Sequence, residues 1–202
     1  MSIYKKIVGL TGIYGSGKTT VADIFRELGH QTVSADQLAH QALNLYSYEL
    51  SKHFGLEILN KDSTVNRRKL GELVFTDSEN KKKLEAIIHP KIRVMADQAF
   101  ESLLKTSKGD LPIIYDCPLL FETGLEKLGF FKIITVTSNE EKIFERVTVR
   151  DKITLEQAIL RYQSQIPLTD KIKKSDFVIE NNSTLEDLKL KVIEVSKSII
   201  LS

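Results

Sequence analysis

The most constraining feature of this sequence is the segment LTGIYGSGKTT at residues 10–20, which fits the pattern G-x-x-x-x-G-K-[ST]. The fixed positions of the pattern are occupied by Gly12, Gly17, Lys18 and Thr19. Glycines let the backbone turn so that successive N–H groups point inward, and the positive end of the following helix attracts anions. The segment therefore predicts a phosphate-binding loop between a strand and a helix.

The residues on either side of the loop have the strand and helix patterns that this prediction needs. The apolar run KIVGL at 6–10 precedes the loop, and apolar residues at helical spacing follow it from Val21 to Leu28. We expect Lys18 to bridge the β- and γ-phosphates of a nucleotide and the Thr19 hydroxyl to bind Mg²⁺. The residues predicted to bind the nucleotide through the loop are Gly12, Ile13, Tyr14, Gly15, Ser16, Gly17, Lys18, Thr19 and Thr20.

Further short apolar runs predict the rest of a sheet. They are rich in β-branched residues and lack the alternation of a half-exposed strand, which is typical of strands buried on both faces of a parallel sheet. Helical patterns separate them, so we predict an α/β fold with a doubly wound, parallel, five-stranded sheet. The additional runs lie at 31–35, 112–116, 131–137 and 176–180.

The chain divides into a core and two helical excursions. Residues 37–110 contain no convincing strand and leave the sheet at the carboxyl end of the second strand, where ligands bind in such folds. We predict that this insertion holds a phosphoryl acceptor, and that 146–174 forms a lid. The nucleotide-binding core is then 1–36, 111–145 and 175–202.

Several local patterns mark where helices begin and end. SNEE at 138–141, STLE at 183–186 and the pair Thr154 and Gln157 match the capping-box signature. Pro90 is expected to end one helix and open the next.

Two aspartates end predicted strands, and each has two possible roles. Asp36 either orients an acceptor hydroxyl toward phosphorus or caps the following helix, and its position alone does not separate the two. Asp116 is predicted to be the second Mg²⁺ contact, directly or through water, and the alternative is an ordinary turn residue.

Arg146 and Arg150 are the candidates for neutralising charge on the transferring phosphoryl group. They are four residues apart and share one face of a helix, although a solvated face with i, i+4 partners is the simpler alternative. The histidines at 30, 40, 53 and 89 have no metal-ligand spacing, so no metal is assigned to them.

Composition excludes some classes of protein. The net charge is only +2 and basic residues are scattered, which argues against a nucleic-acid-binding surface. The apolar runs are too short to cross a membrane, and the N-terminus does not read as a signal peptide. With a single cysteine, Cys117, these features lead us to expect a cytoplasmic protein.

Taken in order, the motifs resemble those of the dephospho-CoA kinase family. The resemblance extends over residues 7–181, and HPKI together with PLLFE is its most specific part. The matching segments are GLTGIYGSGKTT, SAD ending at Asp36, VNRRKLGELVF with Arg67, AIIHPKI with His89, DCPLLFE, ERVTVRD, the Arg161–Gln165 pair, and KSDFVIEN ending at Asn181.

The resemblance implies a reaction, in which ATP with Mg²⁺ phosphorylates the ribose 3′-hydroxyl of dephospho-CoA. It implies that Asp36 orients or deprotonates that hydroxyl, that Arg67 and His89 belong to the acceptor site, and that Asn181 lies near the adenine. Two positions depart from the family: Ile13 replaces a usual glycine and Ser34 a common aspartate. A side chain is tolerable at residue 13 if its φ angle is negative.

Three alternatives stay open at this point. The first is a kinase of the nucleoside-monophosphate-kinase type with a different acceptor. The second is a GTP-binding switch protein, but the TVTSNEEK segment lacks the aspartate of the guanine-reading motif. The third is a non-catalytic scaffold, which would have little reason to combine Lys18, Thr19, Asp36 and the lid arginines.

Overall fold

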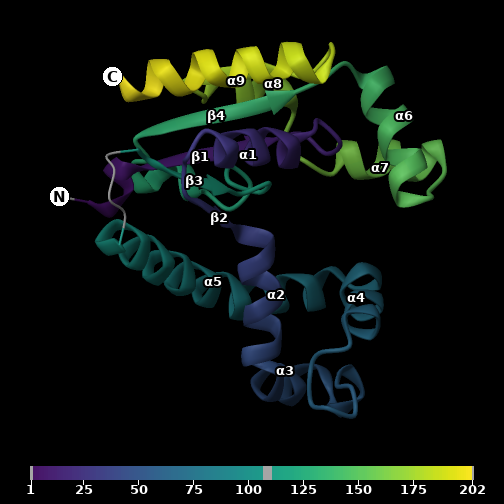
Figure 1. Cartoon of the computed structure of the whole chain (residues 1–202). Helices are drawn as coiled ribbons and strands as arrows, with labels where there is room; N and C mark the ends of the chain where they lie inside the picture. The colour runs from purple at the N-terminus through teal and green to yellow at the C-terminus, as the bar shows by residue number, and fades with distance from the viewer. Residues whose placement is uncertain (1, 107–110, 202) are drawn as a thin grey trace. The chain divides into compact units, whose positions relative to one another are not determined.

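The computed structural model describes residues 2–106 and 111–201. It contains a five-stranded parallel sheet with strand order β2-β3-β1-β4-β5 (Figure 1), which confirms the predicted α/β fold class. The strands are β1 (Ile7–Gly12), β2 (Thr32–Ser34), β3 (Ile113–Asp116), β4 (Lys132–Thr137) and β5 (Phe177–Glu180).

The chain forms two compact units. One comprises the residues up to Val33 and from Phe100 onward, and the other is Ser34–Ala99. The first unit holds α1 (Lys18–Glu27), α6 (Glu140–Asp151), α7 (Leu155–Gln163), α8 (Leu168–Lys173), α9 (Leu185–Ile200) and the 3₁₀ helices Ile3–Lys6 and Leu125–Leu128. The second holds α2 (Ala35–Leu45), α3 (Ser47–Phe54), the 3₁₀ helix Leu56–Ile58, α4 (Arg67–Thr76) and most of α5 (Ser78–Thr106). The functional roles proposed for 37–110 and 146–174 stay predictions.

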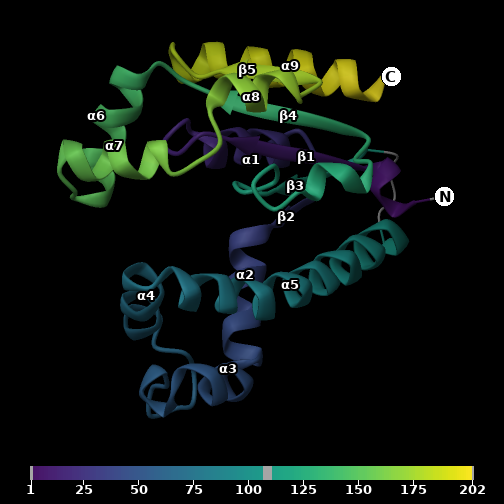
Figure 2. The ribbon, with the colours of Figure 1, turned by 180° about the vertical axis from the view of Figure 1, so that it is seen from behind.

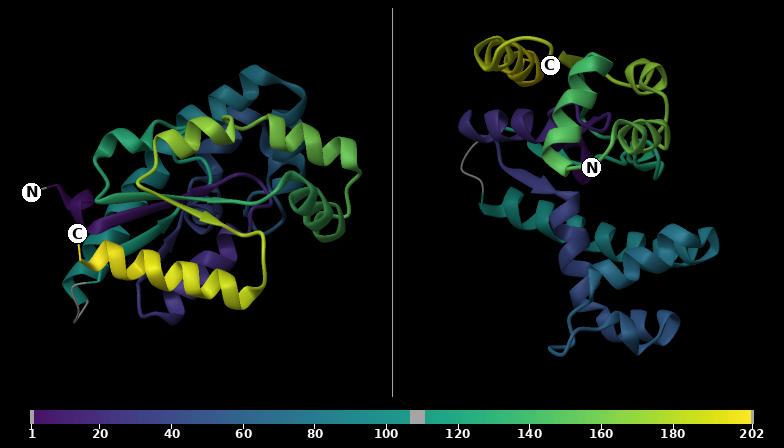
Figure 3. Two further views of the ribbon diagram at one scale, coloured as in Figure 1. Left: turned by 90° about the horizontal axis from the view of Figure 1, so that it is seen from above. Right: turned by 90° about the vertical axis from the view of Figure 1, so that its right-hand side faces the viewer.

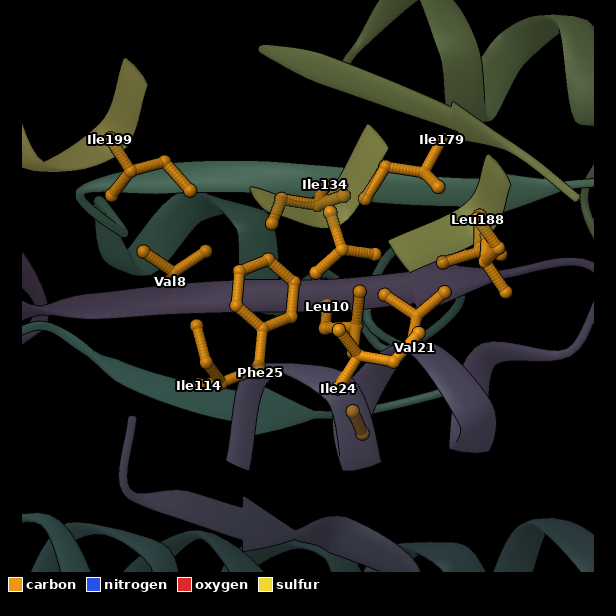
Figure 4. Packing of buried hydrophobic residues seen from close by; sticks show 13 residues of the cluster. Val8, Leu10, Val21, Ile24, Phe25, Ile114, Ile134, Ile179, Leu188 and Ile199 are labelled. Atoms are coloured by element: carbon orange, nitrogen blue, oxygen red, sulfur yellow. The ribbon is translucent and has the colours of Figure 1, made fainter. Parts of the chain in front are cut away.

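The core of the first unit lies between the sheet and the helices α1 and α9. Figure 4 shows Phe25 of α1 beside Val8, Ile114 and Ile134 of the central strands, and all four are fully buried. Burying a side chain of this size stabilises the fold by roughly 1.5–3 kcal/mol. α9 runs alongside the sheet next to β5 (Figure 3), and α6 and α7 lie beyond the carboxyl ends of β1 and β4 (Figure 2).

The second unit has a separate apolar core, contributed by its helices and by the loop before α4. Its fully buried members include Ala42, Leu50 and Ile58, with Leu70 nearly so. The two cores explain why each unit is compact.

The strand β5 differs from the prediction of a strand buried on both faces. It is an edge strand in which only Ile179 is buried, while Val178 is 38% exposed. The apolar run at 176–180 was a correct strand signal, but one run of β-branched residues does not distinguish an edge position from a central one.

The helix ends correct three of the local predictions. The predicted break at Pro90 is wrong, because α5 continues through it from Ser78 to Thr106. Proline removes one backbone hydrogen bond, but buried residues on both sides, such as Ile88 and Ala96, hold the helix in place.

Of the predicted capping boxes, only the one at Thr154 and Gln157 is confirmed. α9 is capped by Thr184 instead of Ser183, through a bond from the Asp187 N–H. Ser138 caps no helix, because its hydroxyl donates to the Asn181 carbonyl oxygen 2.8 Å away.

None of the helices in the described ranges is long and apolar enough to cross a membrane.

Candidate nucleotide-binding site

The phosphate-binding loop connects β1 to α1 and has the backbone conformation that its glycines allow. Gly15 and Gly17 have φ angles of 79° and 87°, in the left-handed region. A Cβ atom at Gly17 would lie 2.2 Å from Asn181 Nδ2. Within the described part of the chain, the positive φ angles outside glycine belong to Ser63 and Lys152. The φ angle of Ile13 is therefore not positive, which is the condition for a side chain at this position in place of the family's glycine.

The loop ends in a helix N-terminus with unpaired donors. The first N–H groups of α1, from Lys18 to Thr20, have no intrahelical partner and form an anion-binding end. The Ser16 hydroxyl oxygen is buried, and within the described chain it has no hydrogen-bond partner. A buried polar atom of this kind is consistent with a ligand in the loop. The Ser16 N–H itself donates to the Ile13 carbonyl oxygen at 3.1 Å.

Lys18 and Asp116 form an ion pair at the carboxyl end of β3. The Lys18 ammonium donates to Asp116 Oδ1, and both side chains are largely buried, with 13% and 14% exposed. The pairing follows from the sheet, because β1 and β3 are adjacent and Leu10 is in register with Asp116. The structure thus brings together a predicted phosphate ligand and a predicted metal ligand.

The donor set suits Mg²⁺, which prefers oxygen ligands and keeps waters and phosphate oxygens around it. Thr19 offers an exposed hydroxyl and Asp116 a carboxylate. Among the described residues, no group of three or more histidine, cysteine or acidic side chains could hold a metal. A metal here would therefore depend on nucleotide phosphates as well as protein oxygens.

Asp36 lies in the first turn of α2, two residues beyond Ser34, the last residue of β2, so the prediction that it ends the strand is wrong. The helix cap is Ser34, whose hydroxyl oxygen accepts from the Gln37 N–H at 3.3 Å. The alternative in which Asp36 caps the helix is therefore wrong. Its exposed carboxylate is left for another role.

The other predicted acceptor residues lie in the same unit. Arg67 Nη1 lies 2.6 Å from His40 Nε2. Because arginine only donates, His40 accepts through Nε2 in this pair. His40 and Asp36 are four residues apart on α2 and share a face. His89 is half-buried in α5. Sequence reasoning missed His40, which follows Asp36 at helical spacing.

Arg146 and Arg150, although on one helix, have different partners. Arg146 donates from Nη1 to Ser138 Oγ at 3.2 Å and from Nη2 to the Asn181 carbonyl at 3.0 Å. Arg150 donates from Nε and Nη2 to Asp151, at 2.7 and 2.9 Å. Arg146 is thus tied to the chain that follows β4 and β5, whereas Arg150 points to a neighbouring carboxylate.

Asn181 supports the phosphate loop directly. Its Nδ2 donates to the Ser16 carbonyl at 2.9 Å, and its backbone N–H donates to the Thr137 carbonyl at 2.8 Å. A contact between Asn181 and adenine stays a prediction.

A cluster around the Tyr14 side chain was not anticipated. The guanidinium carbons of Arg150 and Arg161 lie 5.6 and 5.9 Å from the ring centroid. The Tyr14 hydroxyl donates to Asp151, and the Tyr14 N–H donates to Gln165 Oε1 at 2.6 Å. The hydrogen bonds from Arg150, then that from Tyr14, lower the pKa of Asp151 to about 2.

A buried lysine was also missed. Lys171 of α8 is fully buried, and its ammonium lies 2.7 Å from Glu122 Oε1. It also lies 3.4 Å from the Gly12 carbonyl oxygen and 3.5 Å from that of Pro118. The segment TDKIKKSD contains several lysines, and nothing in it marks this one as buried.

A parallel α/β sheet with a glycine-rich phosphate loop, a lysine on that loop and an acid at the end of the adjacent strand defines the class of P-loop phosphotransferases. Comparison with known proteins narrows the class. The dephospho-CoA kinase (CoaE) family model matches residues 6–187, and the chain belongs to this family.

Two similar proteins carry the name of the family, and a third solved structure is similar over nearly the whole chain. A dephospho-CoA kinase of Fusobacterium nucleatum is 43% identical over 188 residues, covering 92% of this chain and 94% of its own length. The structure of a dephospho-CoA kinase from Campylobacter jejuni is 34% identical, with a TM-score of 0.69 over 97% of this chain and 98% of that one. The structure of TT1252 from Thermus thermophilus is 33% identical, with a TM-score of 0.83 over 95% and 96%.

Proposed function

We propose that this protein transfers the γ-phosphoryl group of ATP to the ribose 3′-hydroxyl of dephospho-CoA, giving CoA and ADP. The observation that carries the proposal is the Lys18–Asp116 pair beside the phosphate loop, in a chain of this family. The bond between the ribose oxygen and phosphorus forms as the bond between phosphorus and the ADP oxygen breaks.

The nucleotide is bound by the loop N–H groups and by Lys18. On nucleotide binding, the Lys18 ammonium donates to the β- and γ-phosphates in place of Asp116. This exchange leaves the Asp116 carboxylate available. Thr19 and Asp116 would hold Mg²⁺, which neutralises phosphate charge when bound.

The acceptor hydroxyl is oriented by Asp36, which takes its proton. Phosphoryl transfer is largely dissociative, so the hydroxyl loses its proton late and an ordinary carboxylate is a sufficient base. The exposed position of Asp36 and its freedom from a capping role support this assignment. We assign Arg67 and His89 to acceptor binding, and the Arg67–His40 contact supports an ordered basic group beside the same face of α2.

Charge on the transferring phosphoryl group is stabilised by Arg146 and Arg150. Arg150 is the better candidate of the two. Its side chain is 60% exposed, and Asp151 takes only two of its five N–H donors. Asn181 is proposed to lie near the adenine. We expect the protein to act in the cytoplasm, without nucleic-acid partners.

The test is a phosphotransfer assay with ATP and Mg²⁺ that compares dephospho-CoA with nucleoside monophosphates, gluconate and shikimate. Of these acceptors, only dephospho-CoA is expected to give ADP release and a 3′-phosphorylated product, which mass spectrometry detects. Efficient transfer to a nucleoside monophosphate would support the rival small-molecule kinase. Binding of GTP without ATP would support a switch protein.

A further inference from the structure

We propose that the Tyr14 side chain is a positioning residue, which holds the guanidinium groups of Arg150 and Arg161 at the phosphate loop with Asp151 as their shared counter-ion. The inference rests on the proposed function in one respect, namely that these arginines act on the transferring phosphoryl group. The contacts that hold them do not depend on it.

The contacts join the loop to α6 and α7 around one aromatic ring. Arg150 and Arg161 each lie within 6 Å of the Tyr14 ring centroid, at 5.6 and 5.9 Å, which is the range of cation–π attraction. Arg161 Nη1 donates to the Tyr14 hydroxyl at 3.3 Å. That hydroxyl in turn donates to Asp151, since an ionised carboxylate only accepts.

Asp151 fixes which edge of each guanidinium is used. It accepts from Nε and Nη2 of Arg150 and lies 3.6 Å from Arg161 Nη1. The Nη1 donors of Arg150 take no part in its contact with Asp151, and the proposal assigns them to phosphate oxygens. Because the pKa of Asp151 is lowered to about 2, the carboxylate stays ionised at any physiological pH.

The backbone of the phosphate loop also contacts α6 and the segment after α7, and these contacts fix the position of the Tyr14 ring. The Tyr14 N–H is bonded to Gln165, just beyond α7. At Gly15, a Cβ would lie 2.6 Å from Val147 Cγ1 and 2.9 Å from Ile143 Cγ2, so the loop packs directly on α6. Arg150 follows Val147 by about one helical turn, which places its side chain over the ring.

The proposal thus assigns the Tyr14 ring a role in turnover as well as in stability. A purely structural tyrosine would contribute to stability alone, whereas a positioning residue contributes to turnover through the arginines. The two roles are separated by kinetics of the full-length protein and by a double-mutant cycle.

The experiment compares Tyr14→Leu, which removes ring and hydroxyl, with Tyr14→Phe, which keeps the ring. Phe131→Leu is the matched control, because Phe131 lies beneath Lys132 at 5.7 Å and belongs to no proposed site. We expect Tyr14→Leu to lower kcat about tenfold, since two cation–π contacts and a charged hydrogen bond are lost. KM for ATP should change less than about threefold. Tyr14→Phe should retain turnover within about threefold of wild type, and Phe131→Leu should leave kcat unchanged.

The cycle between Tyr14 and the two arginines gives the decisive result. In a background that carries both Arg150→Ala and Arg161→Ala, Tyr14→Leu should change kcat by less than about threefold, because both arginines that it positions are gone. Additive losses would overturn the proposal, and so would a Tyr14→Leu variant with unchanged kcat or a Tyr14→Phe variant as impaired as Tyr14→Leu.

A readout without acceptor separates this proposal from the proposed function. Trypsin cleavage after Arg150, followed by mass spectrometry, should be faster in Tyr14→Leu than in wild type or Phe131→Leu. If wild type does not phosphorylate dephospho-CoA, the proposed function fails while this comparison still decides whether Tyr14 holds Arg150. Equal cleavage rates would overturn the positioning role.

Discussion

At the scale of single residues, the candidate site contains two pairs of side chains whose members have different roles. Lys18 and Asp116 neutralise each other, so neither carries an uncompensated charge in a largely buried position. Asp36 and Ser34 lie two residues apart and divide two tasks between them. Ser34 caps α2, and Asp36 retains an exposed carboxylate.

This division predicts that a substitution at Asp36 lowers turnover and spares stability, whereas a substitution at Ser34 lowers stability and spares turnover. Asp36→Asn should lower kcat by about a hundredfold or more, because the acceptor hydroxyl loses its base. KM for ATP and the melting temperature should stay near wild type, because the change is isosteric and spares the helix cap. Steady-state kinetics and calorimetry provide the measurements. Near-normal turnover would remove Asp36 from the catalytic residues.

Ser34→Ala is the matched control. Loss of the cap should destabilise the protein by about 1 kcal/mol while most of the turnover is retained.

At the scale of secondary-structure elements, buried polar side chains join segments that are distant in sequence. His30, after α1, lies 2.9 Å from the Pro112 carbonyl oxygen through Nδ1 and 2.8 Å from Ser196 Oγ through Nε2. A carbonyl only accepts, so Nδ1 carries a proton, and the ring joins the segments after α1 and before β3 to α9. Burial lowers the pKa of His30 from 6.5.

This lowered pKa predicts a pH dependence of stability. The unfolded chain protonates this histidine near pH 6.5, before the folded protein does, so its stabilising contribution is complete above pH 6.5 and is lost as pH falls below that value. The slope is at most about 1.4 kcal/mol per pH unit. Urea unfolding of wild type and His30→Gln between pH 8 and pH 5 checks this. A difference in unfolding free energy that does not shrink on acidification would contradict it.

The pair of Lys171 and Glu122 predicts a large effect at α8. Lys171→Met should destabilise the protein by roughly 3–5 kcal/mol, because Glu122 is left as a buried charge without its partner. Adding Glu122→Gln should recover part of the loss.

Lys173→Met on the same helix is the control. Its pair with Asp170 is 3.8 Å long and mostly exposed, so less than about 1 kcal/mol is expected. Equal effects of the two lysine changes in chemical denaturation would argue against a buried ion pair.

At the scale of the whole molecule, segment 146–174 contributes to the first unit through contacts with the phosphate loop. Gln165, Arg161 and Lys171 each reach residues between Gly12 and Tyr14. Because Arg150 and Arg161 are more than half exposed, we expect ligands that contact them to reduce local opening of this segment.

Limited proteolysis tests that expectation. Trypsin cleavage after Arg150 and Arg161 should slow on addition of ATP with Mg²⁺, and slow further with dephospho-CoA present. Mass spectrometry of the fragments identifies the sites, and cleavage after the exposed Lys197 of α9, which belongs to no proposed site, serves as an internal reference for protease activity. Unchanged rates at Arg150 with both substrates present would indicate a fixed segment.

Local signals in the sequence were sufficient for much of this structure. The loop pattern depends on glycine conformation and a helix N-terminus, both set by neighbouring residues, and the strand runs depend on their own apolar character. The phosphate loop, the parallel sheet and the capping box at Thr154 follow from such short-range physics. The same short-range reasoning was wrong at Pro90 and Ser138, where packing and a partner beyond β5 decided the outcome.

The amino-acid sequence by itself thus determined the fold class, the phosphate loop and the resemblance to one family. Only the tertiary structure decided that Asp116 faces Lys18, that Lys171 is buried behind Gly12, and that the Tyr14 ring meets two arginines. The physical reason is separation along the chain. These partners are about a hundred residues or more apart, and their pairing depends on strand order and helix packing, which no local pattern contains.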